Sequence, residues 1–93
     1  MTMTTIKLKE FGAILTGRDF GKSTLKALTE KFRAPVELDF EGVFSMGSSF
    51  GDEVIPTLAN AQGGHIKVLN ANNVVRTCIE TVAEETKIKV TLE

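Results

Sequence analysis

Two hydrophobic periods alternate along the chain, and this alternation limits the possible folds more than any other feature. Apolar residues occupy every second position, as in strands with one buried face, in residues 5–9, 36–41, 65–69 and 87–92. Apolar residues recur at helical spacing in residues 25–32, 50–61 and 74–82. Strands that alternate with helices predict an α/β domain, because crossover helices bring successive strands side by side.

Each predicted strand carries polar residues at its alternate positions. A parallel sheet covered on both faces would have continuous apolar strands instead. We therefore expect a two-layer sandwich, with a mixed sheet of about four to five strands and helices packed on one face; residues 11–15 would supply the extra strand. The other face would be solvated and would carry charges of both signs: Lys7, Lys9, Glu37, Asp39, Lys67 and Lys89.

The size and charge of the chain restrict its class. Its 93 residues predict one domain, residues 1–93, and a net charge of −1 argues against a general nucleic-acid or membrane-surface binder. No apolar run approaches the roughly 20 residues of a membrane span, and no signal peptide is recognised. With a single cysteine, Cys78, the chain has no internal disulfide to form, and a cytoplasmic location is expected.

Local signals predict where the helices start. Asp19 is a candidate cap for the first helix, and the Asn-rich turn at residues 70–73 is a candidate cap for the third. Pro56 lies inside the second helical pattern and removes one backbone donor. The second helix therefore begins either at Ser48, with a bend, or nearer Asp52.

A serine-rich turn joins the second strand to the second helix, within residues 36–53. Ser48 and Ser49 lie at the predicted helix start, and Asp52 and Glu53 follow one turn later. One interpretation is a phosphorylated switch, in which phosphate sits at the positive end of the helix. The other is simple capping, in which a serine accepts a bond from a helix amide and an acid completes a capping box.

An earlier loop, residues 16–23, is similar to a phosphate-binding loop but does not match it. Three residues, not four, separate Gly17 from Gly21. Arg18 and Lys22 would still suit an acidic group, and the alternative is a plain helix-entry loop.

No arrangement for covalent or metal chemistry is recognisable. The only histidine, His65, has no second histidine to share a metal, and Cys78 lies within an apolar helical stripe. The serines have no nearby base. We expect no enzyme activity, no catalytic residue, no metal and no cofactor.

The residues around the serine turn resemble a known family. The segment 38–43 (Leu-Asp-Phe-Glu-Gly-Val), followed by 48–53 (Ser-Ser-Phe-Gly-Asp-Glu), is similar to the STAS-like domain family of unknown function. The loop Thr16-Gly17-Arg18, with Gly21, also resembles that family. The resemblance extends over residues 11–86, and the anti-anti-sigma factor STAS domains are similar at a greater distance.

The resemblance implies a regulatory module that binds a histidine-kinase-like ATPase or another serine kinase. In anti-anti-sigma factors, a serine in the motif Met-Asp-Ser-Ser-Gly is phosphorylated, and this switches binding. Ser48 corresponds to that serine and Ser49 to the next one. The chain departs from the motif at Gly47, in place of the acid, and at Phe50, in place of the glycine.

We therefore predict a non-catalytic, protein-binding regulatory domain with a switch at Ser48 or Ser49. The predicted partner contacts are Arg18, Met46, Phe50, Asp52 and Glu53. Phe44 and Met46 either close over the core or form an exposed patch. Two alternatives stay open: a domain that binds a small phosphate or nucleotide ligand through Arg18 and Lys22, and a structural subunit that self-associates.

Overall fold

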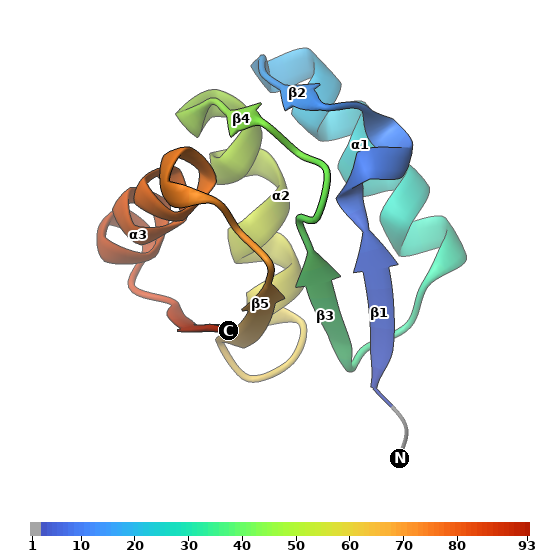
Figure 1. Ribbon diagram of the computed structural model, residues 1–93. Helices are drawn as coiled ribbons and strands as arrows, with labels where there is room; N and C mark the ends of the chain where they lie inside the picture. The colour runs from blue at the N-terminus through green and yellow to red at the C-terminus, as the bar shows by residue number, and fades with distance from the viewer. Residues whose placement is uncertain (1–2) are drawn as a thin grey trace.

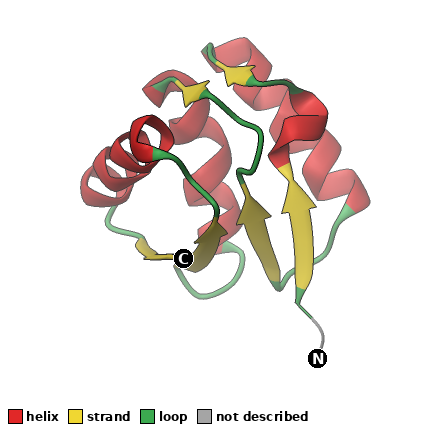
Figure 2. Ribbon diagram, in the orientation of Figure 1, coloured by secondary structure: helices red, strands yellow, loops and turns green. Residues whose placement is uncertain are grey.

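The computed structural model describes residues 3–93 as two layers, a four-stranded sheet and three helices that cover one of its faces (Figures 1 and 2). The strands are β1 (Thr4–Lys7), β3 (Val36–Asp39), β5 (His65–Leu69) and β6 (Lys89–Leu92), and they lie side by side in that order. The helices are α1 (Arg18–Lys31), α2 (Ser48–Asn60) and α3 (Asn73–Thr86).

Every pairing in the four-stranded sheet is parallel. Each helix connects one strand to its immediate neighbour, and the chain crosses the sheet in a single direction, so right-handed crossovers put all three helices on the same face. The predicted α/β sandwich with helices on one face is confirmed. Its strands pair in parallel, however, where a mixed sheet was expected.

The register explains which side chains are buried. Ile6, Leu38 and Val68 lie opposite one another on adjacent strands and are buried beneath the helices. One position earlier, Thr5, Glu37 and Lys67 form a row on the open face. Polar side chains at alternate positions therefore leave one face of the parallel sheet open to solvent, as the alternation predicted.

A second, two-stranded sheet lies beyond the ends of β1 and β3. After a 3₁₀ turn (η1, Leu8–Phe11), strand β2 (Ile14–Leu15) pairs in parallel with β4 (Ser45–Met46). The extra strand expected within residues 11–15 thus exists, but it joins β4 and not the main sheet. Figure 1 shows this pair above the main strands, where α1 and α2 begin.

The helix starts agree with the sequence in two of three cases. Helix α2 begins at Ser48 and runs through Pro56, which decides between the two predicted starts. Asn72 caps α3, since its side chain accepts a bond from the Val75 amide. The predicted cap at Asp19 is wrong, because the N-cap of α1 is Gly17, without a side-chain bond.

For two residues, the structure corrects the expected exposure of the side chain. Asp39 was expected among solvated charges but is only 8% exposed. Val74 was expected in the buried stripe of α3 but is 58% exposed. No helix within residues 3–93 combines the length and the apolar character that crossing a membrane requires.

Candidate functional site at the serine rim

Two helices start side by side at the small sheet. β2 leads to Gly17 and α1, and β4 leads to Gly47 and α2. The Gly47 amide donates to the Leu15 carbonyl at 2.8 Å, and the Cβ of Thr16 lies 3.6 Å from the place that a Cβ on Gly47 would take. The paired strands therefore hold the two helix N-termini next to each other.

Ser48 and Ser49 occupy the first two positions of α2, Ser48 exposed and Ser49 half-buried. The first intrahelical bond runs from the Gly51 amide to the Gly47 carbonyl at 3.0 Å, so the amides of the preceding residues face the helix N-terminus. No side chain of the described residues, 3–93, caps this end. The capping interpretation of the serines is therefore wrong, because Gly47 is the N-cap and the serines lie inside the helix.

The acids after the serines face different neighbours. Glu53 forms an ion pair with Arg18, with 2.7 Å between Oε1 and Nη1, and thereby ties α2 to the start of α1. Asp52 lies toward α3, and one of its carboxylate oxygens, Oδ1, is buried without a hydrogen-bond partner within residues 3–93. The sequence predicted Arg18, Asp52 and Glu53 as separate partner contacts, but the fold brings Arg18 and Glu53 together.

Close contacts fix α2 between the other two helices. A Cβ on Gly21 of α1 would lie 2.9 Å from the Glu53 Cβ and 3.1 Å from the Phe50 carbonyl oxygen. A Cβ on Gly51 would lie 3.2 Å from a methyl of Val82 in α3. Because a larger residue at Gly21 would meet backbone, the position of the serines relative to Arg18 depends on this packing.

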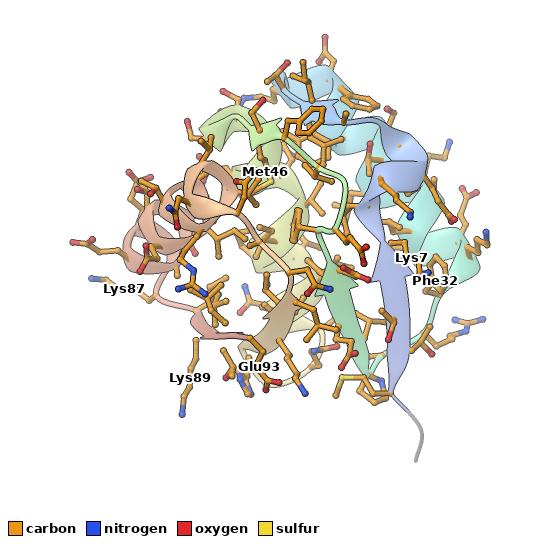
Figure 3. The ribbon with its side chains drawn as sticks, in the orientation of Figure 1. Lys7, Phe32, Met46, Lys87, Lys89 and Glu93 are labelled. Atoms are coloured by element: carbon orange, nitrogen blue, oxygen red, sulfur yellow. The ribbon has the colours of Figure 1, made fainter. Side chains whose placement is uncertain are left out.

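Met46 and Phe50 are core residues, with exposed fractions of 6% and 1%. The Phe50 ring lies 5.3 Å from that of Phe20, centroid to centroid. Met46, labelled in Figure 3, directs its methyl group toward Gly51. The prediction that Met46 and Phe50 form an exposed contact surface is wrong, since both side chains pack inward.

Other apolar side chains are exposed at this end of the molecule. Phe44 and Ile14 are 70% and 62% exposed, beside or within the paired strands, and Val74 lies in the first turn of α3. The Asn72 side chain joins the α3 start to this region, because it donates to the Phe44 carbonyl at 3.0 Å. We call Ile14, Phe44, Ser48, Ser49 and Val74 together the serine rim.

A buried carboxylate holds the loops beneath the rim. Asp39 ends β3 and accepts bonds from the Glu41 amide at 2.9 Å and the Asn70 side chain at 3.0 Å. Burial alone would raise the pKa of Asp39, but these two bonds and the charges of Lys7 and Lys9 outweigh it and lower the pKa. Sequence reasoning missed this role; an acid at a strand end three residues before a glycine was the available signal.

Cys78 is half-buried on α3, near Asp52. Burial, and then the Asp52 charge, raise the pKa of the Cys78 thiol. Such a thiol is poorly suited to act as a nucleophile. Within residues 3–93, no group of three or more potential metal ligands gathers, and His65 Nε2 lies 2.7 Å from the Thr91 hydroxyl.

The fold and the rim define a one-sided α/β domain with a serine at a helix start. Residues 16–76 match the family model described as STAS-like domain of unknown function. The chain belongs to this family, as its sequence suggested. The matched segment runs from the loop before α1 to the first turn of α3 and includes the serine turn. Neither a curated protein nor a solved structure matches the chain.

Proposed function

We propose that the domain is a non-catalytic regulatory module that binds another protein through the serine rim, and that phosphorylation of a rim serine switches this binding. The observation that carries the proposal is the exposure of Ser48 at the start of α2, just after β4, while Phe44, just before β4, is also exposed. The partner is a protein, of the histidine-kinase-like ATPase or serine kinase type that the family resemblance implies.

Ser48 is the better candidate for phosphorylation. Its side chain is exposed, whereas Ser49 is half-buried. A phosphate on Ser48 would bring about −1.5 to −2 charges to the positive end of α2. Glu53 would repel it, but the adjacent Arg18 already balances that carboxylate. A phosphate on Ser48 is therefore compatible with this site, even though Gly47 stands where the anti-anti-sigma factor motif has an aspartate.

The apolar residues supply the binding surface. Ile14, Phe44 and Val74 expose most of their side chains, and aromatic residues at the centre of interfaces often dominate binding energy. A phosphate added within this surface would have to be desolvated when an apolar partner docks. Binding therefore favours the unmodified domain, and phosphorylation releases the partner.

The test uses a purified candidate ATPase of this type, the domain and ATP. We expect mass spectrometry to detect one phosphate on the domain and none on Ser48→Ala. Ser48→Asp and Phe44→Ser should each weaken binding about tenfold or more in a calorimetric titration. The control, Ala27→Ser on the exposed face of α1, should bind normally. Normal binding by both Ser48→Asp and Phe44→Ser would contradict the proposal.

The two alternatives have less support from the contacts. A phosphate ligand between the helix starts would compete with Glu53 for Arg18. Self-association would use the same exposed apolar residues, and light scattering on the purified domain distinguishes it from partner binding.

A further inference from the structure

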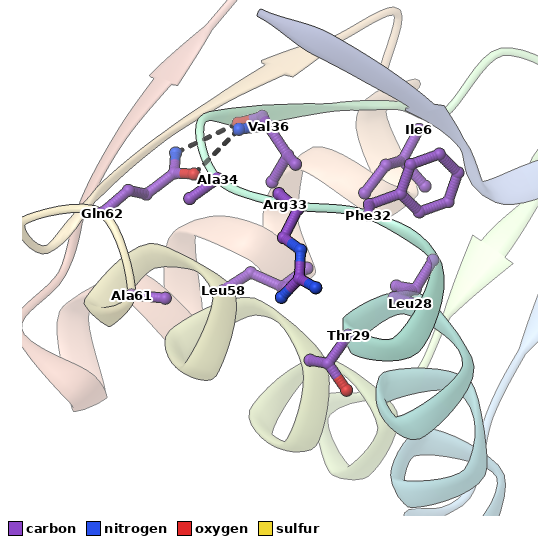
Figure 4. A pocket seen from close by; sticks show the side chains of 10 residues that line it. All are labelled: Ile6, Leu28, Thr29, Phe32, Arg33, Ala34, Val36, Leu58, Ala61 and Gln62. Carbon is purple, nitrogen blue, oxygen red and sulfur yellow. Dashed lines mark hydrogen bonds between the residues drawn. The ribbon is translucent and has the colours of Figure 1, made fainter.

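A cavity of about 180 Å³ lies at the amino-terminal end of the main sheet, away from the serine rim (Figure 4). The last turns of α1 and α2 and the segment that leads into β3 surround it. Its apolar wall includes Ile6, Leu28, Phe32, Val36, Leu58 and Ala61. Most of these side chains belong to the hydrophobic core, so the cavity reaches the core itself.

Two of the polar side chains in the wall already have partners. Gln62 accepts a bond from the Val36 amide at 2.9 Å and donates to the carbonyls of Val36 and His65 at 3.0 Å. The Thr29 hydroxyl donates to the Lys26 carbonyl at 3.1 Å. Figure 4 shows the two bonds between Gln62 and Val36 as dashed lines. The hydrogen-bonding groups of Gln62 and Thr29 are thus used within the fold, and few of them are left to bind a ligand.

Arg33 is different. Its guanidinium lies over the cavity, between Leu58 and Thr29 in Figure 4. It forms no ion pair or side-chain hydrogen bond with any of residues 3–93, although a guanidinium offers five donors. The Lys31 ammonium lies 5.4 Å from the centroid of the Phe32 ring, although Lys31 itself does not line the cavity. An apolar cavity therefore has at its opening a cation without a partner among residues 3–93.

We propose that this cavity binds a small monocarboxylic acid with an apolar body, whose carboxylate pairs with Arg33. Carboxylates match the planar guanidinium in a bidentate geometry. An apolar cavity of about 150 Å³ holds a benzene ring, so this one has space for a single ring or a short chain. Nucleotides and drug-sized ligands need about 300 Å³ or more and are too large.

This binding site is independent of the proposed switch. Arg33 follows α1, and the walls come from the ends of the helices, whereas the rim lies at their starts. The ligand would stabilise the α1–α2 contact, because both helices contribute to the wall.

The test is a methyl NMR titration of the domain with phenylacetate and, separately, with hexanoate. We expect shifts at Ile6, Leu28 and Val36, none at Ile14 or Val74, and a dissociation constant on the order of 1 mM. Shifts confined to the rim methyls, or no shift at a tenfold excess over that concentration, would overturn the proposal.

Matched variants test the role of the charge. Arg33→Gln should weaken phenylacetate binding about tenfold, whereas the neutral phenylacetamide should bind the variant and the natural domain equally weakly. Arg76→Gln, which changes an exposed arginine of α3, is the control and should bind phenylacetate normally. Equal binding of phenylacetate to Arg33→Gln and the natural domain would contradict the carboxylate pairing.

A second variant tests the position of the ligand. Ala61→Leu adds a branched side chain at the wall, from a position that is exposed, and should block both acids while the fold persists. Undiminished binding by this variant would exclude the cavity as the site. If only a peptide with an apolar C-terminal residue binds, and the free acids do not, the small-acid proposal is wrong.

Discussion

The two ends of the molecule differ in how they distribute polar and apolar groups. Around the serine rim, the polar residues Arg18, Asp39 and Asn72 are paired, while apolar side chains of the rim such as Phe44 face solvent. At the cavity most of the apolar side chains are buried, and the cation of Arg33 has no partner within residues 3–93. The rim therefore suits a protein surface, and the cavity suits a small anion with an apolar body.

The largest effect should come from the contact that positions the rim. Gly21→Val introduces a Cβ within about 3 Å of the α2 backbone, so one helix must shift. We expect the free energy of unfolding to fall by about 1–3 kcal/mol in urea denaturation. Ser23→Ala, an exposed position on the same helix, is the control and should stay within about 0.5 kcal/mol. Unchanged stability of Gly21→Val would mean that the helices are not in close contact.

The next comparison is between the losses of stability on replacing Asp39 and on replacing Arg33. Asp39→Ala leaves the Glu41 amide and the Asn70 side chain without an acceptor and should cost about 1–3 kcal/mol. Arg33→Ala removes no ion pair or side-chain hydrogen bond with any of residues 3–93 and should cost less than about 0.5 kcal/mol. Similar losses in the two variants, measured by thermal unfolding, would contradict the difference between the two ends.

The pH dependence of stability has a definite sign at Asp39. Its pKa is lowered in the folded state, so the stabilisation is complete above the ordinary value of 3.8 and is lost as pH falls through the lower, folded value. Asp39→Asn should flatten the fall in stability below pH 3.8. A steep fall that is unchanged in the variant would assign it to other carboxylates.

The two candidate caps should behave differently. Asn72→Ala removes the acceptor of the Val75 amide and the donor to Phe44, and should cost about 1 kcal/mol. Ser48→Ala removes no capping bond and should change the unfolding free energy by less than about 0.5 kcal/mol. A loss at Ser48 as large as that at Asn72 would restore the capping interpretation.

The smallest effect concerns the ion pair at the rim. Arg18 is exposed, so a double-mutant cycle with Arg18→Ala and Glu53→Ala should give a coupling energy of about 0.2–1 kcal/mol that decreases with salt. A coupling insensitive to salt would indicate a contact shielded from solvent.

Local sequence signals were enough to predict the order of the main strands and helices, the one-sided sheet and the cap at the Asn-rich turn, and they gave Ser48 as one of two possible starts of α2. These features depend on neighbours within one or two turns of the chain, which the sequence displays directly. The family resemblance rests on the same local motifs, and it placed the serines at a helix start correctly.

Which side chains are exposed, and which distant residues meet, was decided by the tertiary structure. Periodicity shows which residues share a face, but not which element covers that face. Met46 and Phe50 are therefore buried beneath neighbours, while Phe44 is left exposed. Arg18 meets Glu53 across 35 positions in the sequence, a contact that only the packing of α1 on α2 creates. The cavity beneath Arg33 exists for the same reason, because three separate segments form its wall.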